Sequence, residues 1–156
     1  MQAITSSYGI ELIKSFEKIS LVPYLCPAGF MTIGYGHKMQ TCATYETISK
    51  EEADHIFLKD LQVAENSVLK NIKVTLNQNQ FDALASFTFN VGGGSLQRST
   101  LRQKINRSTF EEAKEEFGRW IYCKNLRIRG LIFRRKIEAE LFSGNVLKRM
   151  PQKHKP

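Results

Sequence analysis

The sequence lacks the segments that export or anchor a protein. No apolar run approaches the ~20 residues of a membrane-spanning helix, and residues 1–7 have neither the basic n-region nor the apolar h-region of a signal peptide. We therefore expect no membrane insertion and a protein held in the cytoplasm of the cell that makes it. If it acts outside that cell, another factor must release it.

Cysteine is scarce, and no metal-binding pattern is present. The three cysteines, Cys26, Cys42 and Cys123, are odd in number and contain no C-x-x-C pair, which excludes a zinc ribbon or a thioredoxin-type motif. The odd count favours reduced thiols. His55 and His154 have no companions at metal-ligand spacing. We expect no metal and no cofactor.

The sequence has the length and composition of a single globular domain, and its charge is unevenly distributed along the chain. The chain has 156 residues, of which 42% are hydrophobic and 24% charged. Residues 1–97 hold 7 basic and 9 acidic residues, whereas residues 98–156 hold 16 basic and 6 acidic ones. The basic half indicates a polyanionic partner, which could be nucleic acid, an anionic membrane face or a cell-wall polymer.

Apolar spacing and capping motifs predict a mostly helical chain. Ser49 with Glu52 and Thr109 with Glu112 have the spacing of capping boxes. Prolines and glycines crowd around a β-forming stretch and predict a small antiparallel sheet over residues 24–47. The expected helices cover 8–16, 49–72, a segment from Asn77 to Gly92, 96–106, 109–121 and 131–142, with a basic loop at 122–129.

This order predicts an α+β fold in two lobes. A small N-terminal lobe with the sheet, about 1–60, and a helical C-terminal lobe, about 73–144, are joined by the long helix at about 49–72. A basic tail follows at 145–156. Two lobes joined in this way leave a cleft between them.

Glu17 is the first candidate for chemistry. It ends the first expected helix, where a carboxylate meets the negative end of the helix dipole. A glutamate at this position is therefore electrostatically unfavourable for the helix. Apolar Phe16 and Ile19 flank it. Such surroundings favour the protonated form, as a general acid requires.

Residues around Glu17 carry a family resemblance. Glu17, eight residues, Cys26, five residues and Thr32 match a signature of the phage-type lysozymes, the endolysins of glycoside hydrolase family 24. The match extends over roughly residues 8–144. Further matching segments are Thr32-Ile33-Gly34-Tyr35-Gly36-His37, Phe89-Asn90-Val91-Gly92, Ser99-Thr100-Leu101, Trp120 with Tyr122, Gly130-Leu131 and Arg134-Arg135.

The resemblance implies a lysozyme-like fold, a single catalytic domain over 1–156, and hydrolysis of the β-1,4 bond between N-acetylmuramic acid and N-acetylglucosamine in peptidoglycan. Glu17 would be the proton donor, and Thr32 with Cys26 would hold a water on the opposite face of the sugar. Phe89 and Thr100 match positions that line the sugar cleft. A monomer released by a holin is also implied.

Three assignments stay open. Cys26 is either a water-holding group or a small buried filler, because a neutral thiol is a weak acceptor, and a disulfide with Cys42 or Cys123 would remove its function. Phe89 could equally be helix core. Either Arg134 or Arg135 could pair with Glu17 across the cleft.

Two other functions compete. The basic half could mark a nucleic-acid-binding module, but acidic residues alternate with the basic ones and no binding motif appears, so we expect no specific nucleic acid. A lytic transglycosylase would cut the same bond with a lone Glu, but it would have no need of Thr32 to hold water.

Overall fold

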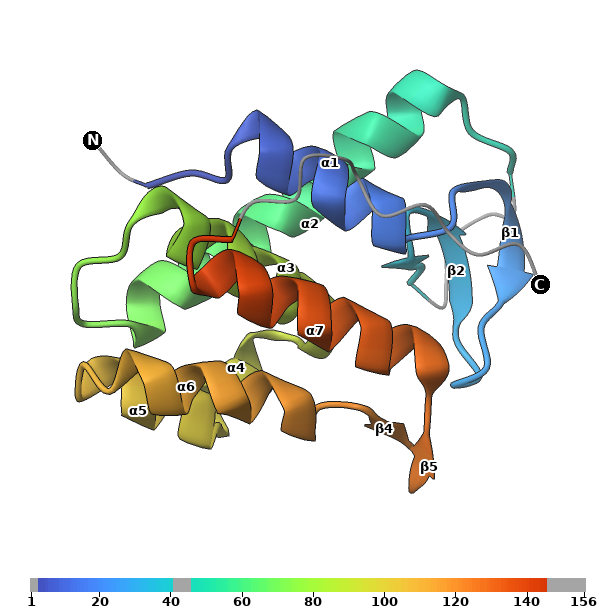
Figure 1. Ribbon diagram of the computed structural model, residues 1–156. Helices are drawn as coiled ribbons and strands as arrows, with labels where there is room; N and C mark the ends of the chain where they lie inside the picture. Colours follow the sequence, from blue (N-terminus) through green and yellow to red (C-terminus); the bar gives the residue numbers. More distant parts are fainter. Residues whose placement is uncertain (1–2, 41–45, 146–156) are drawn as a thin grey trace.

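The computed structural model describes residues 3–40 and 46–145 and shows the predicted α+β fold (Figure 1). Cys42 and the tail beyond residue 145 lie outside these ranges. The elements in chain order are α1 (Ser7–Phe16), β1 (Ser20–Leu25), β2 (Met31–Gly34), β3 (His37–Lys38), α2 (Lys50–Asn71), α3 (Gln78–Val91), α4 (Gly93–Arg98), α5 (Thr100–Asn106), α6 (Phe110–Glu116), the 3-10 helix η1 (Phe117–Arg119), β4 (Tyr122–Cys123), β5 (Leu126–Arg127) and α7 (Arg129–Phe142).

The main sheet is antiparallel in the order β1-β2-β3. It begins at Ser20, before the predicted start at residue 24, and its last described strand ends at Lys38. Pro23 lies inside β1, where the register shifts between Ser20 and Tyr24. An edge strand with an irregular register tolerates a proline, which cannot donate a ladder hydrogen bond.

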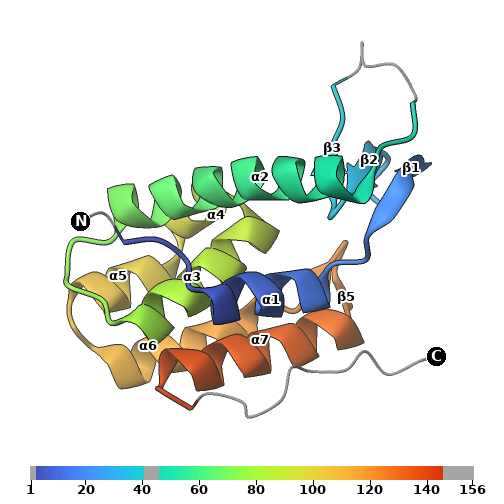
Figure 2. The same ribbon diagram turned by 90° about the horizontal axis from the view of Figure 1, so that it is seen from above.

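The long helix α2 carries the predicted capping box. Ser49 Oγ accepts from the Glu52 amide at 3.1 Å, and Glu52 Oε2 accepts from the Ser49 amide at 2.7 Å. The helix packs against β2 at one end and against α3 and α4 along its length (Figure 2). Within 3–40 and 46–145, no helix is both long and apolar enough to cross a membrane.

Helix α3 forms the centre of the helical part. Eight consecutive residues, from Phe81 to Thr88, are buried because α1, α2, α4 and α7 all pack against this helix. Asn77 closes a capping box with Gln80 at the start of α3. Gly92, at a φ of 88°, ends it as the sequence predicted.

Two predicted helices have different bounds. The segment expected as one helix over 96–106 is two helices, because Ser99 caps α5 by accepting from the Arg102 amide at 3.0 Å. The capping box expected at Thr109 is wrong. Its hydroxyl donates to the Lys104 carbonyl at 3.1 Å, and α6 ends at Glu116.

The predicted basic loop at 122–129 is also wrong. It contains the hairpin β4–β5, with Tyr122 opposite Arg127. Lys124 and Asn125 form its two-residue turn, at φ values of 48° and 64°. Two positive φ values match the twist of a short antiparallel hairpin.

Candidate active site

The three predicted catalytic residues lie on α1 and on the first hairpin of the sheet. Glu17 is the C-terminal cap of α1, and its amide donates to the Ile13 carbonyl at 3.2 Å. Cys26 directly follows β1, and Thr32 lies in β2, paired with Tyr24. A Cβ added at Gly36 would lie 3.4 Å from Glu17 Oε2. The β2–β3 turn therefore passes beside the Glu17 carboxylate.

Arg134, and not Arg135, pairs with Glu17. Arg134 Nη1 donates to Glu17 Oε1 at 2.6 Å, and its guanidinium lies 4.8 Å from the centre of the Phe16 ring. The Arg134 side chain is 4% exposed and that of Glu17 is 20% exposed. Arg135 instead donates to Asn90 Oδ1 at 2.6 Å. The pair joins the end of α1 to α7, which run alongside each other in Figures 1 and 2.

Cys26 has surroundings that favour its thiolate. Hydrogen bonding from the backbone of Phe30 is the main effect that lowers the pKa of the Cys26 thiol, and the side chain of Thr32 adds to it, against partial desolvation. The Cys26 amide donates to the Phe30 carbonyl at 2.9 Å, which closes the turn around the sulfur. Cys26 is a free thiol, half-buried.

Thr32 and Tyr24 complete this side of the site. The Thr32 side chain is almost fully buried, and its hydroxyl donates to the Phe30 carbonyl at 3.0 Å. Burial raises the pKa of Tyr24, and the negative charges of Glu17 and Cys26 raise it further. The charges of both groups therefore act on Tyr24.

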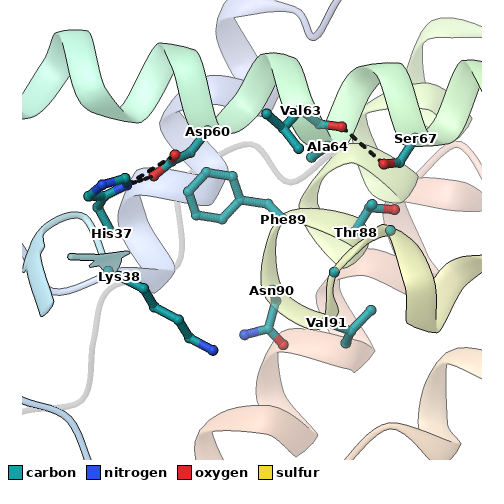
Figure 3. A pocket seen from close by; sticks show the side chains of 13 residues that line it. His37, Lys38, Asp60, Val63, Ala64, Ser67, Thr88, Phe89, Asn90 and Val91 are labelled. Atoms are coloured by element: carbon teal, nitrogen blue, oxygen red, sulfur yellow. Dashed lines mark hydrogen bonds and ion pairs between the residues drawn. The ribbon is translucent and has the colours of Figure 1, made fainter. Parts of the chain in front are cut away.

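A pocket of about 390 Å³, shown in Figure 3, reaches the site at Gly36, whereas Glu17, Cys26 and Thr32 do not line it. Phe89 lines it, half-buried, with its ring 5.3 Å from that of Phe57. Phe89 therefore packs against the core and also lines the pocket, and its contact with substrate stays a prediction. Thr100 is exposed and does not line this pocket. The lining residues are Gly36, His37, Lys38, Asp60, Val63, Ala64, Ser67, Thr88, Phe89, Asn90, Val91, Gly92 and Gly93.

Sequence reasoning missed Asp60 and the role of Asn90. His37 Nδ1 donates to Asp60 Oδ2 at 2.8 Å, so α2 fixes the ring at one edge of the pocket (Figure 3). Asn90 lies on the opposite wall, from the end of α3. Asp60 carries no local signal because it occupies an ordinary polar position of a long helix, whereas Asn90 stands within the Phe-Asn-Val-Gly segment.

The fold together with this site defines the chain as lysozyme-like. It superposes on the endolysin from Escherichia coli O157:H7 phage FAHEc1 with a TM-score of 0.83 and 31% identity, covering 97% of this chain and 99% of that one. It superposes on the muramidase domain of SpmX from Asticaccaulis excentricus with a TM-score of 0.81 and 33% identity, covering 91% and 98%. The predicted lysozyme-like architecture is confirmed.

The family follows from the sequence relatives. The profile of the phage lysozyme family matches residues 14–138, and the chain belongs to this family. It is 36% identical over 143 residues to the endolysin of Acyrthosiphon pisum secondary endosymbiont phage 1, covering 89% of this chain and 97% of that relative. It is 40% identical over 139 residues to the endolysin of Bacillus phage B103, covering 88% of this chain. The chain spans about half the length of that endolysin and of its Bacillus phage PZA counterpart (53% and 56%).

Proposed function

We propose that this chain is an endolysin that hydrolyses the β-1,4 bond between N-acetylmuramic acid and N-acetylglucosamine in peptidoglycan. The observation that carries the proposal is the Glu17 carboxyl, partly exposed beside a pocket and held by Arg134 at 2.6 Å. The chain has this arrangement in a lysozyme-like fold and belongs to the phage lysozyme family.

Glu17 is the proposed proton donor. In its protonated form it transfers a proton to the glycosidic oxygen as the bond breaks, the general-acid step of glycoside hydrolysis. The carboxylate that results gains a full charge-assisted hydrogen bond from Arg134. Arg134 thereby stabilises the product state of the proton transfer and fixes the direction of the carboxyl group.

Thr32 and Cys26 are the proposed water-holding groups. The Thr32 hydroxyl has one proton, which it shares between the Phe30 carbonyl and the Cys26 sulfur, and its lone pairs are free to accept from a water. The lowered pKa of the Cys26 thiol favours a thiolate, a negatively charged acceptor, in the place where many glycosidases have a second carboxylate. A water held there attacks the sugar on the face opposite Glu17.

The adjoining pocket is the proposed glycan site. Phe89 offers an apolar ring edge for a sugar face, and Asn90 and Asp60 offer polar groups for hydroxyl and acetamido groups on either wall. Thr100 lies outside the pocket lining. A contact from Thr100 to substrate is therefore proposed only for a glycan that extends beyond the pocket.

The alternatives are less well supported. A lytic transglycosylase closes an internal ring instead of using water, so it gives no role to the Thr32 and Cys26 pair opposite Glu17. The matched relatives are endolysins and a muramidase domain, and none that we compared points to a nucleic-acid-binding module. We further propose that the enzyme works as a monomer and reaches the wall after a holin opens the membrane.

The test compares the wild type with Glu17→Gln. General acid catalysis contributes typically ~10²–10⁴-fold, so Glu17→Gln should clear outer-membrane-permeabilised Gram-negative cells at least ~100-fold more slowly. Glu11→Gln is the matched control, because Glu11 is an exposed carboxylate on the same helix. Mass spectrometry of the products should show reducing ends and no 1,6-anhydro sugar. Equal clearing by the wild type and Glu17→Gln would refute the assignment.

A further inference from the structure

A second carboxylate, Glu138, is buried behind the Glu17–Arg134 pair. Its side chain is fully enclosed. Its Oε1 atom accepts from Arg134 Nε at 3.0 Å and from Ser86 Oγ at 2.7 Å. Its Oε2 atom lies 3.0 Å from Arg135 Nε, a close ion pair without hydrogen-bond alignment. A fully buried carboxylate is costly unless it has a specific partner, and this one has two arginines.

We propose that Glu138 is a positioning residue for the proton donor, acting on Glu17 through Arg134. The proposal rests on the function proposed above for Glu17. It extends the machinery of that reaction by a residue that touches neither substrate nor the reacting atoms.

Arg134 connects Glu138 to the Glu17 carboxyl through hydrogen bonds. Its Nε is held by Glu138, its Nη2 donates to the Ser86 carbonyl at 3.0 Å, and its Nη1 donates to Glu17 at 2.6 Å. The guanidinium is a rigid planar fork, so fixing two of its nitrogens fixes the direction of the third. Glu138 and the Ser86 carbonyl together therefore determine where Arg134 places the Glu17 carboxyl.

The buried cluster around Arg134 also has balanced charges. Glu17 and Glu138 carry two negative charges, and Arg134 and Arg135 carry two positive ones, so the cluster on α1 and α7 is neutral when Glu17 is ionised. On the sheet side, the Glu17 charge acts on Tyr24, whose pKa it helps to raise. Without the Glu138 charge, two arginines would face one carboxylate and would favour its ionised form. A proton donor needs the opposite form.

Arg135 extends the same cluster to the pocket. Burial lowers the pKa of Arg135, and the Glu138 charge opposes that effect. Arg135 Nη2 donates to Asn90 Oδ1 at 2.6 Å, and Asn90 lines the pocket. Because Arg135 has its own hydrogen bond to Asn90, we expect a change at Glu138 to leave this wall of the proposed glycan site in place.

The experiment compares Glu138→Gln with the wild type in kcat, KM and the pH–rate profile on soluble glycan strands. We expect kcat at neutral pH to fall at least ~10-fold with little change in KM, and the alkaline limb to move about one pH unit lower, the scale on which a single neighbouring charge acts. Glu140→Gln is the control, since Glu140 is a more exposed carboxylate of α7 paired with Lys114. A kcat and an alkaline limb like those of Glu140→Gln would overturn the proposal.

Two further measurements keep the result interpretable. If Glu138→Gln does not fold, Ser86→Ala removes the hydrogen bond to Glu138 and a longer one from Arg134 Nη2 at 3.4 Å, and it keeps both charges. It should lower kcat several-fold without moving the alkaline limb; an unchanged kcat in Ser86→Ala would then overturn the proposal. Carbon NMR of the Glu17 carboxyl follows its titration without substrate, and its midpoint should lie lower in Glu138→Gln. If the midpoint shifts but the wild-type protein does not cleave peptidoglycan, the proposed function is refuted and the role of Glu138 is not. If the midpoint does not shift, the role of Glu138 is refuted.

Discussion

At the scale of single residues, Cys26 is the most unusual group of the site, because a thiol stands where a carboxylate is common in glycosidases. The turn that encloses it supplies hydrogen bonds from the Phe30 backbone and from Thr32, and these lower the pKa of the thiol. The lowered pKa supports the hypothesis of a working thiolate over that of an inert filler.

This hypothesis predicts a distinct pH dependence. Cys26→Asp should keep activity, whereas Cys26→Ala should lose at least ~10-fold because no acceptor remains for the water. The pKa of a thiol is higher than that of a carboxylic acid. As the pH falls, activity that needs the thiolate is therefore lost at a higher pH than activity that needs a carboxylate. The acid limb of the wild-type pH–rate profile should therefore lie at higher pH than that of Cys26→Asp.

The control for this prediction is Cys123→Ala, since Cys123 is a free and exposed cysteine on the hairpin β4–β5. A thiol-blocking reagent should inhibit the wild type and Cys123→Ala but spare Cys26→Asp. Equal rates of Cys26→Ala and the wild type under reducing conditions would show that Cys26 only fills space.

The residues of the site differ in how well the sequence predicts them. Glu17, Cys26 and Thr32 lie within 16 residues of one another, so a local motif is enough to select them. Glu138 is over a hundred residues from Glu17, and it acts through a buried arginine. On the sequence it is one of two glutamates on a basic helix, and its burial distinguishes it from Glu140.

At the scale of the elements, local signals predicted the structure where the backbone adopts the conformation that the motif requires, and failed where it does not. Ser49 and Asn77 cap their helices as predicted, because each side chain finds its own backbone three residues on. Thr109 has the same motif, but its ψ of 68° lies outside the extended range of the other two caps, and its side chain makes no capping hydrogen bond. The hairpin at 122–127 was missed because its turn depends on positive φ at Lys124 and Asn125, not on a glycine.

The difference between these caps is measurable. Loss of a serine cap costs ~0.5–2 kcal/mol, so Ser49→Ala should lower the free energy of unfolding by about 1 kcal/mol in urea titrations. Thr109→Ala is the matched control at the start of α6 and should cost less, because that side chain makes no capping hydrogen bond. An equal loss in both variants would contradict the assignment of Ser49 as the stronger cap.

At the scale of the whole molecule, Asp54 joins three parts of the fold. Asp54 Oδ1 accepts from Lys14 of α1 at 2.9 Å, and Oδ2 accepts from Lys50 of α2 at 3.0 Å. Hydrogen bonding from Lys14, then from Lys50, lowers the pKa of Asp54 from 3.8 to about 2, with Tyr35 of the sheet side contributing as well. One carboxylate therefore ties α1, α2 and the segment after β2 together.

Asp54 should make the fold sensitive to acid. A pKa lowered on folding contributes stability that is present above the ordinary value of 3.8 and is lost as the pH falls through about 2. The melting temperature of the wild type should thus exceed that of Asp54→Asn at pH 6, and the difference should shrink between pH 4 and pH 2. A difference that stays constant over this range would contradict the role of the Asp54 charge.

The placement of the proposed proton donor has a consequence for how the proposed reaction can vary. Glu17 ends a helix that packs on α3 and is held by α7, whereas Cys26 and Thr32 belong to a surface hairpin of the sheet. No hydrogen bond in the described ranges joins the Glu17 side chain to either residue, so the two halves of the chemistry have separate supports. The proposed water-holding residue could therefore be exchanged, a carboxylate for the thiol, while the proposed proton donor keeps its own fixed surroundings.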